Sequence, residues 1–132
     1  MSKFEASFGP TKESIKEECA KMYEMYINGC EMTKTEMGWA CWYMAMSEDR
    51  QCYALLCKLL DDPDVRKAAE ACYHLHQSKF AREDAILHER LIGIIRSRDV
   101  GRALPALQAL FQFEYALPEE MILFILRTYY EQ

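Results

Sequence analysis

The chain has 132 residues, of which 51% are hydrophobic and 28% are charged, and its formal net charge is −5. This length and balance indicate one globular domain that is large enough to bury a real hydrophobic core. The apolar runs Met121–Leu126 and Trp39–Met46 are both far shorter than the ~20 residues of a membrane-spanning helix. The negative net charge also disfavours a dedicated nucleic-acid-binding domain, which is usually strongly basic.

Seven helices are predicted, because apolar residues recur at helical spacing and no stretch alternates long enough to predict a strand. Asn28-Gly29 ends the first helix, and the pattern Thr33-Lys34-Thr35-Glu36 is a capping box that begins the second. Ser47 is predicted to cap the third helix, and Asp62 followed by Pro63 is predicted to begin the fourth. The expected ranges are 11–28, 34–46, 48–60, 63–77, 80–97, 100–113 and 118 to about 129.

Short turns between these helices predict antiparallel neighbours. We therefore expect an all-α fold, a compact single-domain bundle of about six to seven antiparallel helices, with stacked helical hairpins of the HEAT kind as a variant. Residues 1–10 are predicted to form a flexible N-terminal arm, and residues 11–132 to form a single helical domain.

Two segments resemble helical repeats. The stretch LLDDPDVRKAAEACYHL, residues 59–75, resembles the turn and second helix of a HEAT repeat, and residues 99–130 look like a hairpin of the pentatricopeptide kind. We expect neither motif to recur elsewhere at a fixed period, as a solenoid would require. The pattern thus favours generic capped helices over true repeats. The resemblance implies scaffolding or partner binding rather than chemistry.

Six cysteines are present, and four of them, Cys19, Cys30, Cys41 and Cys52, are equally spaced along the chain. Two successive members of this series, if they shared one helix, would lie ~16 Å from each other, too far for a disulfide. Structural zinc sites prefer closely spaced pairs of ligands. We expect these cysteines to be reduced and to face the core as small hydrophobic residues.

A metal site would have to draw Cys72, His76 and His88, with Cys52 or Cys57, together from three helices. The competing interpretation places Cys72 in the core and leaves the histidines partly exposed. No phosphate-binding glycine loop and no Glu-x-x-His pair is present. We therefore predict a protein that is not an enzyme and that uses no metal or other cofactor.

The segment from Met22 to Met46 concentrates methionine and aromatic residues, and the stretch GWACWYM is apolar on nearly every side. Core packing accounts for much of it, but a surplus of such side chains is typical of an adaptable contact surface. The candidate partner-binding residues are Met25, Met37, Trp39, Trp42 and Tyr43.

A second patch consists of basic side chains around the turn between the fifth and sixth helices. Its members are Arg90, Arg96, Arg98 and Arg102. A solvated face with local ion pairs is the simpler interpretation, whereas contact with phosphates is the alternative.

These observations predict a non-catalytic helical protein-protein interaction module: a subunit, adaptor or inhibitor of a larger complex, with a viral or phage antagonist as one such case. The alternative is a nucleic-acid-associated helical protein that uses the arginine cluster. The expected partner is another protein or a second copy of the chain, and no membrane is expected. Because the N-terminal stretch lacks the apolar segment of a secretory signal, we expect the protein in the cytoplasm or another reducing compartment of a cell.

Overall fold

The computed structural model describes residues 12–130, which form seven α-helices and no strand. Short 3₁₀ turns extend α4 and α5, and a π turn extends α8. The predicted arm at residues 1–10 lies outside the described residues. The elements are α2 (Lys12–Ile27), α3 (Lys34–Met46), α4 (Arg50–Lys58) with η1 (Leu59–Asp61), α5 (Val65–His74) with η2 (Leu75–Gln77), α6 (Ala85–Arg96), α7 (Val100–Gln112) and α8 (Glu119–Ile125) with η3 (Leu126–Tyr130).

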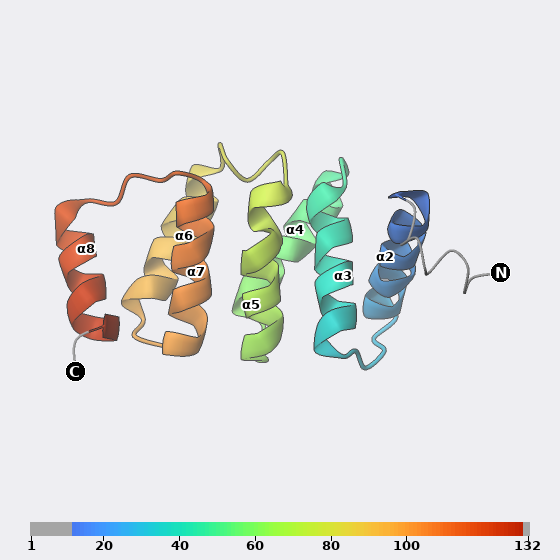
Figure 1. Ribbon diagram of the computed structural model, residues 1–132, viewed down its shortest axis with the longest axis horizontal. Helices are drawn as coiled ribbons and strands as arrows, with labels where there is room; N and C mark the ends of the chain where they lie inside the picture. The colour runs from blue at the N-terminus through green and yellow to red at the C-terminus, as the bar shows by residue number, and fades with distance from the viewer. Residues whose placement is uncertain (1–11, 131–132) are drawn as a thin grey trace.

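The helices are stacked as consecutive hairpins (Figure 1). Helices α3, α5 and α7 stand side by side in a row near the viewer, and α4 and α6 lie behind them. The contacts of α5 with both α3 and α7, and of α6 with α7, hold the stack together. Helices α2 and α8 lie at its two ends. The predicted all-α fold is confirmed, in the variant with stacked helical hairpins.

The capping box is present as predicted. The Thr33 hydroxyl accepts a hydrogen bond from the Glu36 N–H at 3.1 Å, and the Glu36 carboxylate accepts one from the Thr33 N–H at 2.8 Å. The fifth helix begins later than predicted, at Ala85. The preceding turn holds Ser78, and Asp84 provides the cap that starts the helix.

Two predicted caps are wrong by two positions. Asp49, not Ser47, caps α4, and Asp64, not Asp62, caps α5; each carboxylate accepts the N–H two positions further on, at 2.8 and 3.0 Å. Ser47 and Asp62 instead accept the backbone N–H of these two aspartates, at 3.0 and 2.8 Å. Each upstream side chain thus forms a small turn that sets up the true cap.

The cap positions reveal an internal repeat. Asp49 and Asp84 cap the first helices of two consecutive hairpins, and Asp64 lies the same distance before Asp99, at the start of α7. The two units are residues 49–83 and 84–118. The positions that are identical between them are Asp49/Asp84, Leu56/Leu91, Asp64/Asp99, Val65/Val100, Ala68/Ala103, Ala71/Ala106, Leu75/Leu110, Gln77/Gln112 and Ala81/Ala116. The expectation that no motif recurs at a fixed period is therefore wrong.

The repeated residues do the same structural work in both units. Leu56 and its counterpart Leu91 are fully buried in the first helices, and the matched alanines of α5 and α7 are buried too. Small side chains at these positions permit the close approach of α5 and α7, which contact each other directly. The period is shorter than the ~40–47 residues of HEAT units.

One continuous hydrophobic core runs from Met22 on α2 to Ile125 on α8. Cys19, Cys41, Cys52 and Cys72 are buried, Cys57 is partly buried, and all six cysteines are free. Cys30 differs from the expectation because it is exposed. It follows Gly29, whose φ of 77° ends α2 in the left-handed conformation that glycine adopts without strain.

Candidate partner-binding groove

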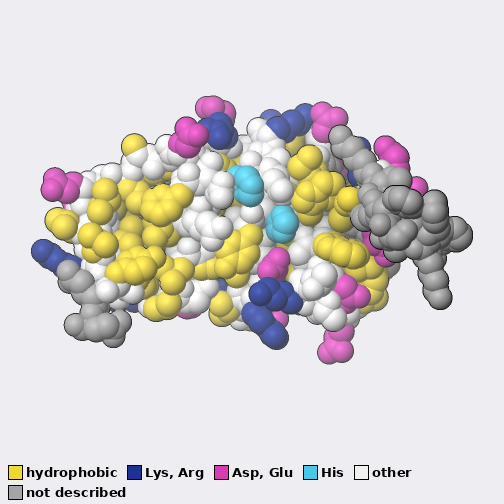
Figure 2. Space-filling view, viewed as in Figure 1, with side chains coloured by type: hydrophobic (Ala, Val, Ile, Leu, Met, Phe, Trp, Pro, Cys, Tyr) yellow, Lys and Arg dark blue, Asp and Glu magenta, His cyan; other side chains and the backbone are white. Residues whose placement is uncertain are grey.

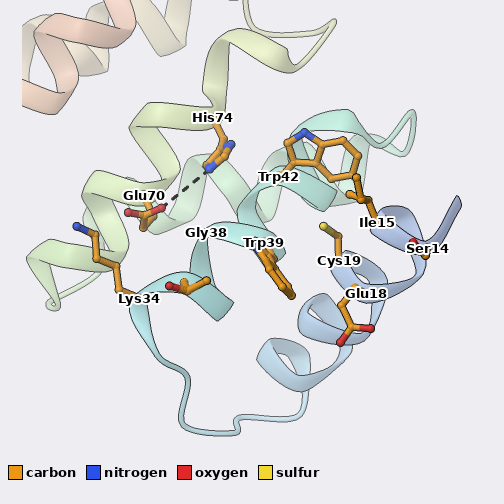
Figure 3. A pocket seen from close by; sticks show the side chains of 11 residues that line it. Ser14, Ile15, Glu18, Cys19, Lys34, Gly38, Trp39, Trp42, Glu70 and His74 are labelled. Carbon is orange, nitrogen blue, oxygen red and sulfur yellow. Dashed lines mark ion pairs between the residues drawn. The ribbon is translucent and has the colours of Figure 1, made fainter. Parts of the chain in front are cut away.

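A groove of about 920 Å³ lies along α3, between α2 and α5 (Figure 3). Trp39 and Trp42 project into it from α3. Cys19 and Glu18 line it from the α2 side, and Glu70 lines it from the α5 side. Hydrophobic side chains gather over this end of the molecule in the space-filling view (Figure 2). The groove is open to solvent, and its floor is mainly aromatic and aliphatic.

Local sequence explains why the two tryptophans share this surface. Trp39 and Trp42 are three positions apart on α3, so they lie on one face of the helix. The opposite side of α3 carries Ala40, Cys41 and Met44, which are buried in the core. Because the core side is already filled, the indoles remain outside it, and Trp39 is 43% exposed.

Gly38 brings α5 close to α3 at the edge of the groove. A Cβ atom at Gly38 would lie 2.9 Å from the Glu70 Oε1 atom, so the carboxylate occupies the space that a side chain would need. Glu70 also lies 4.0 Å from the His74 Nε2 atom, and His74 Nδ1 lies 2.9 Å from the Gln77 side-chain oxygen. The side chains of Glu70 and His74 are only 13% and 22% exposed. The carboxylate is therefore held in place at the rim.

The groove presents negative charge beside aromatic surface. Glu18 lies on the α2 side and Glu70 on the α5 side, and the basic residues among those that line it are Lys34 and His74. An indole face attracts a cation placed within ~6 Å of its ring, and a carboxylate forms a strong hydrogen bond with an ammonium or guanidinium group. The chemistry of the groove thus suits a basic side chain carried by an apolar segment.

The structure brings together two of the five predicted contact residues, Trp39 and Trp42. Met37 is only 2% exposed, so it belongs to the core and is removed from the contact surface. Tyr43 stacks on Tyr23 with their ring centroids 4.8 Å apart, and Met25 packs against the core. Neither lines the groove. A helix has one outward face, and the sequence of α3 did not mark which of its apolar residues occupy it.

Sequence reasoning missed the residues that α2 and α5 contribute. They are Ile15, Glu18 and Cys19 on α2, and Glu70 and His74 on α5. Their only signal was indirect: Gly38, inside an otherwise regular helix, marks a place where another group approaches closely.

The arginine patch divides into two pairs. Arg90 donates hydrogen bonds to the Asp61 carboxylate at 2.8 Å and to the Cys57 carbonyl at 3.1 Å. Arg102 donates to the carbonyls of Leu60 and Asp62, at 3.3 and 2.7 Å. Both guanidinium groups therefore bind the end of the first repeat unit's α4 and the turn that follows it.

The other two arginines contact α8. Arg96 donates a hydrogen bond to the Met121 sulfur at 3.1 Å. The Arg98 guanidinium lies over the Phe124 ring, 5.6 Å from its centroid. Each of the four side chains thus has a contact within the chain.

Burial keeps several thiols neutral. It raises the pKa of Cys72 to about 12, and burial followed by the nearby charge of Glu70 raises the pKa of Cys41 further above its ordinary value. In the groove, burial and then Glu18 raise the pKa of Cys19. A neutral thiol is a poor nucleophile and a poor metal ligand. These cysteines therefore serve as apolar packing.

Cys72, His76 and His88, three of the residues considered for a zinc site, do not share one environment. Cys72 is buried, His76 is exposed, and His88 packs against the rings of Phe113 and Tyr115, with centroids at 5.2 and 5.4 Å. Within residues 12–130, no group of three or more His, Cys, Asp or Glu side chains is placed to hold a metal ion.

Comparison of the chain with models of protein families, with curated proteins and with solved structures finds no match. None of the helices in the described part of the chain has both the length and the apolar character that a membrane span requires.

Proposed function

We propose that the protein is a non-catalytic interaction module that binds a segment of another protein in the groove between α2, α3 and α5. The observation that supports this best is the pair of tryptophans, Trp39 and Trp42, in an open, mainly apolar groove with a volume of about 920 Å³. Tryptophan is enriched among the residues that contribute most to binding at protein interfaces. A groove of this size accommodates several side chains of a partner segment.

The negative charges of the groove favour a partner segment that contains a basic residue. It carries a lysine or arginine that lies over an indole and pairs with Glu70, flanked by apolar side chains that fill the space near Ile15 and Cys19. Glu18 on the opposite side adds to the attraction. Such a complex combines apolar burial, which tolerates salt, with one partly buried ion pair, which is less screened than a surface pair.

The nucleic-acid alternative has less support. Arg90 and Arg102 each have an acidic partner, Asp61 and Asp99, and both also donate to backbone carbonyls. Binding to a phosphate would have to compete with these contacts. A reducing compartment such as the cytoplasm fits the six free cysteines, and we retain it as part of the proposal.

The test is a peptide array that varies one position at a time, probed with the purified full chain. We expect selection for Lys or Arg next to Leu, Ile or Phe. The Kd of the best peptide, measured by fluorescence anisotropy, should rise at least tenfold in Trp39→Ala and about three- to tenfold in Glu70→Gln. Tyr73→Ala, an exposed aromatic on α5 that does not line the groove, is the matched control and should bind as the wild type does.

Two results would overturn the proposal. One is selection for acidic or purely polar peptides, which the carboxylates of the groove do not favour. The other is a Kd that stays the same in Trp39→Ala while that variant retains its helical circular dichroism spectrum. A steep loss of affinity for single-stranded RNA with rising salt, abolished by Arg96→Ala, would favour the alternative instead.

A further inference from the structure

Helix α8 is buried on one face and apolar on the other. Met121 and Ile125 are buried against the stack, and the Tyr129 hydroxyl donates a hydrogen bond to the Ile95 carbonyl. On the remaining surface, Ile122 and Leu126 are each 44% exposed, and Leu123 is also exposed. Figure 2 shows hydrophobic side chains gathered at this end of the molecule, over α7 and α8.

The repeat places α8 as the first helix of another hairpin. Met121 corresponds to Leu87, and Ile125 corresponds to Leu91. The spacing within each of these pairs is one position shorter than the spacing between Asp49 and Asp84. Both leucines, Met121 and Ile125 are buried. Helix α8 therefore repeats the inward face of α6 at nearly the period that relates α6 to α4.

The same alignment of the repeats identifies the residues of α4 and α6 that correspond to the exposed residues of α8, and the side chains that cover them. Ile122 of α8 corresponds to His88 of α6 and to Tyr53 of α4. Tyr53 packs on Phe80, with ring centroids 5.5 Å apart, and His88 packs on Tyr115 at 5.4 Å. Phe80 and Tyr115 follow the residues they cover at the same distance along the chain, and each lies just beyond the second helix of its hairpin. Within residues 12–130, no further helix follows α8 and η3 to form the second half of such a hairpin.

Leu126 follows the same rule. Its counterparts are Ile92 on α6 and Cys57 on α4, and both of these are partly buried and pack against the core. Ile122 and Leu126 are therefore exposed positions whose counterparts are at least partly covered in the other two hairpins, whereas Glu89 and Ala54, the counterparts of Leu123, are exposed there too.

We propose that the α8 face formed by Ile122 and Leu126 receives an amphipathic helix of a partner protein, in the position that α7 takes against α6. This site goes beyond the proposed function, because the groove lies at the opposite end of the stack.

The repeat also predicts the residue pattern of the helix that would bind here. The second helices α5 and α7 share Ala-x-x-Ala-x-x-x-Leu, at Ala68 to Leu75 and Ala103 to Leu110. An aromatic residue follows each of them.

The probe is a fluorescent peptide with the sequence of residues 99–117, titrated into the full chain and followed by anisotropy. We expect saturable binding that weakens at least tenfold in the double variant Ile122→Lys/Leu126→Lys. Ile86→Lys, at a 75%-exposed residue of α6 outside this face, should bind as the wild type does. A second peptide with Asp at both shared alanines should not bind.

A covalent version avoids dependence on peptide affinity. A copy of residues 99–117 appended directly after Gln132 follows the original segment at the same spacing that relates α8 to α6. We expect the Tm of the extended chain to rise by several degrees, and the rise to disappear when Ile122→Lys/Leu126→Lys is introduced.

The proposal is overturned if the peptide does not bind and the extended chain gains no stability, or if binding persists in the double variant. A concentration-dependent dimer that the double variant abolishes would assign the face to a second copy and would also overturn it. The Trp39→Ala variant should leave both readouts unchanged, which separates this site from the groove.

Discussion

The Tyr53 hydroxyl donates a hydrogen bond of 2.7 Å to the carboxylate of Asp84, and this bond joins the first helices of the two repeat units. Asp84 also caps α6 by accepting the Leu87 N–H at 3.0 Å. Although burial alone would raise the pKa of Asp84, these hydrogen bonds lower it below its ordinary value. One carboxylate thus both starts a helix and fixes that helix to the preceding unit.

We expect Tyr53→Phe to lower the free energy of unfolding by about 1–2 kcal/mol, because it removes one hydrogen bond to a charged acceptor. Urea unfolding followed by circular dichroism measures this, with the exposed Tyr73→Phe as control.

The hydrogen bond between Tyr53 and Asp84 also makes the stability of the fold depend on pH in the acidic range. A carboxyl group with a lowered folded-state pKa stabilises the fold above its unfolded pKa of ~3.9, and this stability is lost as the pH falls through the folded-state pKa. Tyr53→Phe should move the pKa of Asp84 upward, as NMR titration of its carboxyl carbon measures. An unchanged pKa would mean that the bond does not form in solution.

Arg102, near the start of α7, forms hydrogen bonds with the turn between α4 and α5. Its guanidinium donates to three carbonyls, of Leu60, Asp62 and Pro63. Lysine keeps the charge but loses the planar fork, so we expect Arg102→Lys to destabilise the protein by about 1–3 kcal/mol. Arg66→Lys, whose side chain is 83% exposed, should change stability by less than ~0.5 kcal/mol. Equal effects of the two substitutions would contradict this assignment.

The buried thiols predict a loss of stability at alkaline pH. Burial raises the pKa of Cys72 to about 12 and raises that of Cys41 as well, whereas thiols in the unfolded chain ionise near ~8.5. Above that pH the folded state binds more protons than the unfolded state, so stability falls as the pH rises.

Urea midpoints at pH 7 and pH 10 test this, and Cys72→Ala should reduce the difference between them. In native protein, a thiol reagent should modify Cys30 within seconds and reach Cys41 and Cys72 only after unfolding. Rapid modification of all six thiols would show that the core is not packed as described.

Helix locations could be predicted from the sequence because their signals are local. The capping box at Thr33 defined the start of α3 to the residue. The starts of α4 and α5 were displaced by two positions because Ser47 and Asp62 are good caps in isolation. Only the fold decides which of two nearby acceptors takes the helix N–H groups.

The groove was predictable in part, and the repeat was not recognised. The surplus of aromatic residues marked Trp39 and Trp42, but it marked Met37 equally, since burial depends on how α3 is rotated against α5. The repeat was missed because its units share few identities and are related mainly by burial, as Tyr53 and His88 illustrate: they differ in chemistry but are covered by matching aromatic residues.

Helices α5 and α7 are equivalent helices of consecutive units, and they stand in parallel with adjacent starts. A Cβ atom at Gly101 would lie 2.9 Å from Val65 Cγ1, which places the two Cβ atoms at most about 4.4 Å apart, within disulfide range. In a Cys30→Ser background, Val65→Cys/Gly101→Cys should therefore form a disulfide under mild oxidation, whereas the control pair Val65→Cys/Val100→Cys should not. Failure of the first pair to cross-link, or equal cross-linking of both, would contradict the stacked arrangement of repeat units from which the proposed role of the α8 face follows.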